Sequence, residues 1–160
     1  MFHRHQVNLA VVVDGWGRTN RLNHTWELQK DFAKSITPAL GDRNLFINGG
    51  SASYVQSAHS ASDTSSGTFH SLEEFESHVD AVNVVTGRTS IDEGIKQARS
   101  LLTAAPPALA AFIIIIVYDG NPLPRYLRSV QQADAARGEG VEVFVVGIGG
   151  KYSKHVRVVL

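Results

Sequence analysis

Several short stretches of this chain are almost entirely apolar, which is typical of parallel β-strands buried on both faces. The strands predicted in this way are Val7–Val13, Asn44–Asn48, Ala111–Gly120 and Val141–Gly150. The stretch from Ser51 to Gly67 is rich in Ser and Ala and weakly patterned. It predicts a short edge strand near residues 54–55 and then a flexible loop, and the final "HVRVVL" can form a short last strand.

Between these runs, apolar residues recur at helical spacing. The first predicted helix carries on its inner face Trp26, Leu28, Phe32, Ala33 and Ile36. Pro38 and Gly41 are expected to end it. Another helix is predicted over Arg125–Arg137, closed by Gly138.

Two capping boxes predict the starts of two further helices. In Ser71–Glu74 and again in Ser90–Glu93, the Ser hydroxyl and the Glu carboxylate can each accept a hydrogen bond from an unpaired backbone N–H. The residues expected to point inward are Leu72, Phe75, Val79 and Val82 in the first of these helices, and Ile91, Ile95, Ala98 and Leu102 in the second.

This order of elements predicts the fold class. Strands that read as buried alternate with helices, which indicates an α/β protein with a Rossmann-like, open and mostly parallel sheet flanked by helices on both faces. No repeat or linker divides the chain, so a single domain is expected over residues 1–160. Residues 1–6 are expected to be a flexible N-terminus, and residues 151–160 a short C-terminal segment.

Composition narrows the function classes. Lys and Arg together number 15, as do Asp and Glu, and this balance argues against binding to nucleic acid or to a membrane surface. The chain has no cysteine, which excludes disulfides, thiol catalysis and Cys-based zinc sites. The longest apolar stretch contains Pro106 and Pro107 and is too short for membrane insertion. No secretory signal peptide is visible at the N-terminus.

Two aspartates follow the two most apolar strands. Asp14 comes directly after the first strand, and Asp119 ends the run "AFIIIIVYDG". If these strands are neighbours at the centre of the sheet, their ends lie about 5 Å apart, and two carboxylates so close need a cation, a shared proton or a basic side chain between them. The simpler interpretation is that Asp followed by Gly is an ordinary turn signal.

A hydroxyl residue is expected near the two aspartates. Thr89 comes immediately before the second capping box, at the entrance of a helix. Hydroxyl and carboxylate oxygens are hard ligands that suit Mg²⁺ or Ca²⁺ better than zinc or copper. Five histidines show no ligand pairing at i and i+4 and are interpreted as surface or cap residues: His24, His59, His70, His78 and His155. His3 and His5 can bind a metal adventitiously at the N-terminus.

Together these motifs resemble the von Willebrand factor A domain, also called the integrin inserted domain. That family carries a metal-ion-dependent adhesion site, built from D-x-S-x-S after the first strand, a Thr in a middle loop and an Asp after the fourth strand. The resemblance matches these ligands to Asp14, Thr89 and Asp119, and it covers nearly the whole chain from Val7 to Gly150. It implies a non-enzymatic module that binds a protein or an extracellular-matrix component through the loops at one end of the sheet, outside the cell or at its surface.

The chain departs from the family pattern at both motif serines. Trp16 and Arg18 occupy their positions, so the site is degenerate. In one interpretation, Asp14, Thr89 and Asp119 still hold Mg²⁺ weakly, with waters in place of the serines. In the other, the Arg18 guanidinium neutralises the carboxylates and no metal binds. Contacts to a protein ligand, including an acidic residue of that ligand, are expected from Trp16, Arg18 and Asn121. The favoured alternative for Trp16 is that it packs against the loop.

Two other functions have weaker support in the sequence. The stretch "VVVDGWG" is similar to the start of cofactor-independent phosphoglycerate mutase, which would imply a fragment of a Mg- or Mn-dependent phosphoryl-transfer enzyme. That family needs a serine nucleophile and a spread set of His and Asp ligands, which cannot be placed in 160 residues. A dinucleotide site is also weakly indicated, because "GWGRTN" is only a fragment of G-x-G-x-x-G.

Overall fold

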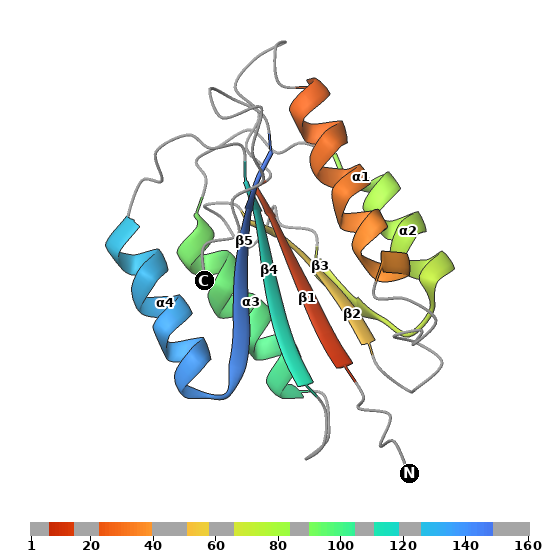
Figure 1. Cartoon of the computed structure of the whole chain (residues 1–160). Helices are drawn as coiled ribbons and strands as arrows, with labels where there is room; N and C mark the ends of the chain where they lie inside the picture. The colour runs from red at the N-terminus through yellow and green to blue at the C-terminus, as the bar shows by residue number, and fades with distance from the viewer. Residues whose placement is uncertain are drawn as a thin grey trace.

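The computed structural model describes residues 7–14, 23–39, 51–57, 66–83, 90–104, 111–118 and 126–148. Its elements are β1 (Val7–Asp14), α1 (Asn23–Ala39), β2 (Ser51–Ser57), β3 (Ser66–Phe69), α2 (Leu72–Ala81), α3 (Ile91–Ala104), β4 (Ala111–Tyr118), α4 (Tyr126–Gly138) and β5 (Val141–Gly147). The strands form one five-stranded sheet in the order β3-β2-β1-β4-β5. All neighbouring pairs are parallel except β2 and β3. The predicted α/β class with a mostly parallel sheet is therefore confirmed (Figure 1).

The helices cover the sheet from both sides. Helices α1 and α2 lie on one face, and α3 and α4 lie on the other (Figure 1). Side chains of β1 alternate between the two layers, because successive residues of a strand point to opposite faces. Leu9, Val11 and Val13 belong to the core under α1 and α2, whereas Ala10 and Val12 belong to the core under α3 and α4.

The inner faces of the helices were largely predicted correctly. All four inward positions of α3 are buried, as are Phe75, Val79 and Val82 of the α2 segment. Leu28 and Leu72 are exposed, contrary to the prediction. Leu28 lies five positions before the buried Ala33. In a helix with 3.6 residues per turn, this spacing places the two side chains on nearly opposite sides. Leu72 begins α2 beside β3, the last strand at this side of the described sheet.

Two element boundaries also differ from the prediction. Pro38 lies inside the last turn of α1 instead of ending it. Helix α4 extends through Gly138, and the left-handed residue that follows is Gly140, with φ of 82°. The Gly140 N–H donates to the Arg137 carbonyl at 3.0 Å, which closes the turn into β5.

The stretch from Ser51 to Gly67 was interpreted wrongly. Strand β2 is no edge strand, because it pairs with β1 along its whole length and buries Val55 completely. The edge strand is β3, which begins at Ser66 within the predicted loop. The predicted strands at residues 44–48 and 155–160 and the N-terminal residues 1–6 lie outside the described residues. None of the described helices is long and apolar enough to cross a bilayer.

Candidate functional site

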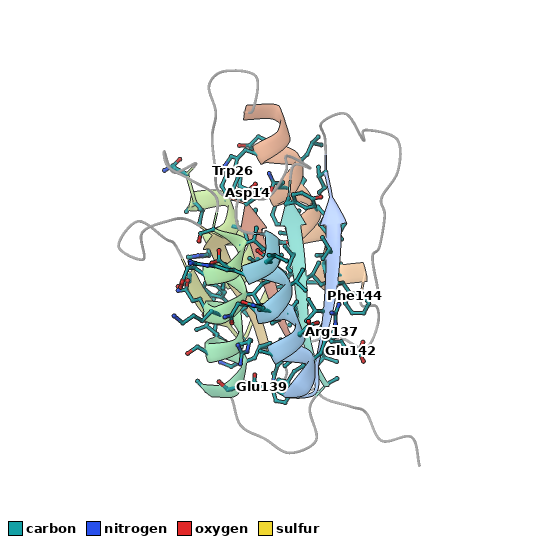
Figure 2. All side chains as sticks on the ribbon, turned by 90° about the vertical axis from the view of Figure 1, so that its left-hand side faces the viewer. Asp14, Trp26, Arg137, Glu139, Glu142 and Phe144 are labelled. Atoms are coloured by element: carbon teal, nitrogen blue, oxygen red, sulfur yellow. The ribbon has the colours of Figure 1, made fainter. Side chains whose placement is uncertain are left out.

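Asp14 is the last residue of β1, at the end of the sheet where β1, β4 and β5 all finish, which we call the carboxyl edge. Figure 2 shows it at the same end of the molecule as Trp26 and at the opposite end from Glu139. The residues Ala10 and Val12 of β1 face α3 and α4, and strand alternation places Asp14 on the same side. Its side chain is almost completely buried, with a relative exposure of 3%. A carboxylate removed from water in this way is stable only when hydrogen bonds or a positive charge compensate it.

The strands that carry the two aspartates are neighbours, as the prediction required. Val13 of β1 is paired with Val117 of β4, one residue before the end of each strand. Tyr118 ends β4, and Asp119 follows it in the sequence. The adjacency of β1 and β4 is thereby confirmed, whereas Asp119 itself lies outside the described residues.

The first turn of α3 lies at the same edge as Asp14. Helix α3 packs on β1 and β2 and runs antiparallel to them, so it begins at the carboxyl edge and ends beside the start of β4 (Figure 1). Two polar residues are buried in this turn: Ser90 has a relative exposure of 1% and Asp92 of 6%. The Ser90 hydroxyl donates a hydrogen bond of 2.9 Å to Asp92 Oδ1. Asp14, Ser90 and Asp92 are thus polar groups that the fold buries at one end of the sheet.

The two capping boxes have different outcomes. At the start of α2 the Ser71 hydroxyl accepts from the Glu74 N–H at 3.2 Å, as the motif predicted. At the start of α3 the Ser90 hydroxyl donates to Asp92, and Glu93 is exposed, 3.6 Å from Lys96. Ser90 thus has a buried carboxylate as a partner, a contact that the capping-box motif did not predict.

Sequence reasoning missed Asp92 as a buried polar residue of this edge. A signal was present, because Asp92 lies three positions before Ile95 and shares the inner stripe of α3 with it. An acidic residue in such a stripe indicates a partner close to the helix entrance. The other predicted site residues, which are Trp16, Arg18, Thr89 and Asn121, lie outside the described residues.

An ion pair joins the two helices on the other face of the sheet. Lys34 of α1 donates to Asp80 of α2 at 2.7 Å, and this hydrogen bond raises the pKa of Lys34. Among the described residues, no three His, Asp or Glu side chains are grouped so that they could hold a metal ion. The polar groups described at the carboxyl edge are therefore Asp14 and the Ser90–Asp92 pair. The other predicted site residues belong to the segments that connect the strands and helices.

Comparison with known proteins gives the same assignment from the sequence and from the fold. The model of the von Willebrand factor type A domain matches residues 8–159. No match is found among curated protein sequences.

Solved structures with this fold come from several kinds of protein. Proximal thread matrix protein 1 from the mussel byssus superposes with a TM-score of 0.70 at 20% identity, over 91% of this chain and 38% of that one. The pilus adhesin SpaC from Lactobacillus rhamnosus GG has a TM-score of 0.67 at 15% identity, over 95% of this chain and 25% of that one. Manganese-loaded TRAP protein of Plasmodium vivax has a TM-score of 0.61 at 18% identity, over 91% of this chain and 58% of that one. This chain thus spans less than two thirds of each of these three proteins.

Von Willebrand factor type A domains are generally non-enzymatic modules of adhesion and protein–protein interaction, and they often bind a metal ion. The strand order, the burial of Asp14 at the carboxyl edge and the match over residues 8–159 lead to one conclusion. This chain belongs to the von Willebrand factor type A domain family.

Proposed function

We propose that this domain binds a protein partner through the loops at the carboxyl edge, and that its adhesion site works without a metal ion. The observation that carries the proposal is the burial of Asp14 at the end of β1, next to the end of β4. A buried carboxylate at this place is stabilised by hydrogen bonds or by a nearby positive charge, and a positive charge compensates it most strongly.

Arg18 is the group that we assign to this role. It follows Asp14 by four residues, in the segment that leaves β1 at the carboxyl edge. Its planar guanidinium can bond two carboxylate oxygens at once, a geometry that a Lys ammonium does not match. A second cation beside it is disfavoured, because two unit charges 4 Å apart repel by about 4 kcal/mol at an effective dielectric constant of 20.

The remaining donors fit a divalent cation poorly. Trp16 has no oxygen and Arg18 is a cation, so the two positions that hold serine ligands in the family motif supply none. Asp14, Thr89 and Asp119 would leave the other positions of a Mg²⁺ shell to water. The alternative in which these three residues bind Mg²⁺ weakly is therefore the less favoured one.

Without a metal, recognition of the partner has a different chemistry. An acidic partner residue would pair with the Arg18 guanidinium instead of completing a metal shell. Trp16 and Asn121 would supply an aromatic anchor and a hydrogen-bonding amide beside it. The adhesin and matrix-protein structures that share the fold support an extracellular or cell-surface setting, with a matrix component as the partner class.

Thermal melting in EDTA, Mg²⁺ and Mn²⁺ tests the metal-free site. The unmodified chain should keep the same Tm in all three solutions. The variant Trp16→Ser/Arg18→Ser, which restores both motif serines, should gain several degrees with Mn²⁺, because a ligand that binds only the native state stabilises it. Arg137→Ser is the matched control, since Arg137 is an exposed arginine of α4 paired only with Asp134 among the described residues. A clear gain with Mg²⁺ in the unmodified chain contradicts the proposal.

The phosphoryl-transfer alternative gains no support from the described residues. Asp14 ends a strand of the sheet as a metal-ligand aspartate would, but the described residues hold no group of three His, Asp or Glu side chains that could bind a metal ion with it. Release of phosphate from a phosphomonoester in the presence of Mn²⁺ would revive that alternative.

A further inference from the structure

Helix α4 lies at the outside of the molecule, beside α3 and the last described strand, β5 (Figure 1). The inner side of this helix is fixed to the rest of the domain. Ala136 is buried in the core that contains Leu102 of α3 and Val141 of β5, and Gln132 accepts a hydrogen bond of 2.8 Å from Arg99. The outer side of α4 is therefore held in one position on the surface.

The first turns of α4 expose two large apolar side chains. Leu127 has a relative exposure of 74%, the highest among the large apolar residues that the structure describes, and Val130 has 37%. A spacing of three residues places these two side chains next to each other on a helix. Leu28 of α1 and Leu72 of α2 are also exposed, but each lies alone on its helix. Single exposed apolar residues need no explanation, whereas Leu127 and Val130 form a contiguous patch.

A positive charge lies beside this apolar pair. Of the six Lys and Arg residues that the structure describes, five form an ion pair with a described carboxylate, and these are Lys30, Lys34, Lys96, Arg99 and Arg137. Arg128 is the sixth, an exposed residue for which no such pair is found among the described residues. The acidic residue of α4, Asp134, is already paired with Arg137 at 3.2 Å.

Four side chains make up this surface, which we call the α4 patch: Leu127, Arg128, Val130 and the exposed Gln131. They span about 6 Å along the axis of the helix, since each residue rises 1.5 Å. A stable dimer of two domains needs about 800 Å² on each partner, which four side chains do not supply. The α4 patch therefore suits a short segment of another protein better than a second copy of this domain.

We propose that the α4 patch binds a segment of a protein partner in which an acidic residue stands beside an apolar one. The Arg128 guanidinium can donate two parallel hydrogen bonds to the carboxylate of that segment. Leu127 and Val130 can then bury the neighbouring apolar side chain against the helix. None of the four residues belongs to the adhesion site at Asp14, so this binding is independent of the metal-free recognition proposed above.

Titration with short peptides, followed by the amide chemical shifts of the unmodified chain, is the first test. The probe is the tetrapeptide Leu-Asp-Leu-Leu with blocked ends, which should cause saturable shifts at residues 127–131. Replacement of its aspartate by asparagine should raise the Kd about threefold, because an exposed ion pair is lost. Replacement of its leucines by alanine should raise the Kd about tenfold or more. Absence of saturable shifts at residues 127–131, or equal binding of the asparagine peptide, overturns the proposal.

Variants of the patch are the second test. Leu127→Ser should weaken binding of the probe about tenfold, and Arg128→Gln about threefold. Leu72→Ser and Arg137→Gln are the matched controls and should leave the Kd unchanged, since they alter an exposed leucine and an exposed arginine outside the patch. Binding by Leu127→Ser equal to that of the unmodified chain overturns the proposal.

Self-association is the remaining alternative. Sedimentation equilibrium of the unmodified chain should show a monomer. A dimer that Leu127→Ser dissociates would mean that a second copy occupies the α4 patch, and this also overturns the proposal.

Discussion

Arg99 and Glu139 join the two helices that cover one face of the sheet. The Arg99 Nε donates to Glu139 Oε2 at 3.0 Å, its Nη2 donates to the second carboxylate oxygen, and its Nη1 donates to Gln132 Oε1 at 2.8 Å. Arg99 lies in α3 and Glu139 in the turn after α4, so this fork ties the end of α4 to the neighbouring helix. Glu139 lies at the opposite end of the molecule from Asp14 (Figure 2).

Removal of the hydrogen bonds between Arg99 and Glu139 should make the stability of the fold less dependent on pH in the acid range. The hydrogen bond from Arg99 lowers the pKa of Glu139, so the pair stabilises the fold above the ordinary Glu pKa of 4.5 and loses this effect as pH falls through the lowered value. Glu139→Gln should therefore lower the Tm by a few degrees at pH 7 and by less at pH 3. Thermal melting across this range checks it, with Glu93→Gln as the control for an exposed carboxylate. A constant difference at every pH would contradict the prediction.

His78 should make the fold weaker below neutral pH. Its ring lies against Phe69, with 4.7 Å between ring centroids, and burial lowers its pKa from 6.5. The unfolded chain therefore binds the proton more readily, and stability falls as pH drops below about 6.5. Urea unfolding at pH 7.5 and 5.5 should show a smaller loss of stability for His78→Gln than for the unmodified chain. His70→Gln, at an exposed position, should behave like the unmodified chain.

Gly67 should not tolerate a side chain. A Cβ at this position would lie 2.8 Å from Phe69 Cζ, and the Phe69 ring also packs against Phe75 and His78. We expect Gly67→Ala to destabilise the fold by about 1–3 kcal/mol, because the ring must leave its contacts. Gly138→Ala is the control, since a Cβ there meets nothing within 4 Å. Equal free energies of unfolding in urea for the two variants would rule out this role of Phe69.

Asp14 and Arg18 should be energetically coupled if Arg18 compensates the buried carboxylate. In a double-mutant cycle of Asp14→Asn and Arg18→Gln, the coupling free energy should be about 0.5–3 kcal/mol. The same cycle with Arg128, an exposed residue of α4, should give none. Additive effects of Asp14→Asn and Arg18→Gln would mean that another group satisfies Asp14.

The sequence by itself determined the kind of fold and most of the buried faces. Long apolar runs such as those of β1 and β4, and the stripe of α3, are local patterns whose period follows from backbone geometry alone. The placement of Asp14 after a central strand could be read in the same way, because both strands of the pair are almost continuously apolar.

Only the tertiary structure decided the identity of the edge strand and the environment of Asp92. Strands β2 and β3 have little apolar pattern, and they are strands because their backbones pair with β1 and with each other. Asp92 and Glu93 are both acidic residues of one helical turn, and only the packing of α3 against the sheet buries the first and exposes the second. The pairing of β2 and β3 depends on neighbours that are distant in sequence, so no local pattern could specify it. For Asp92 the apolar stripe of α3 indicated an inward position, and the packing of α3 against the sheet fixed its burial.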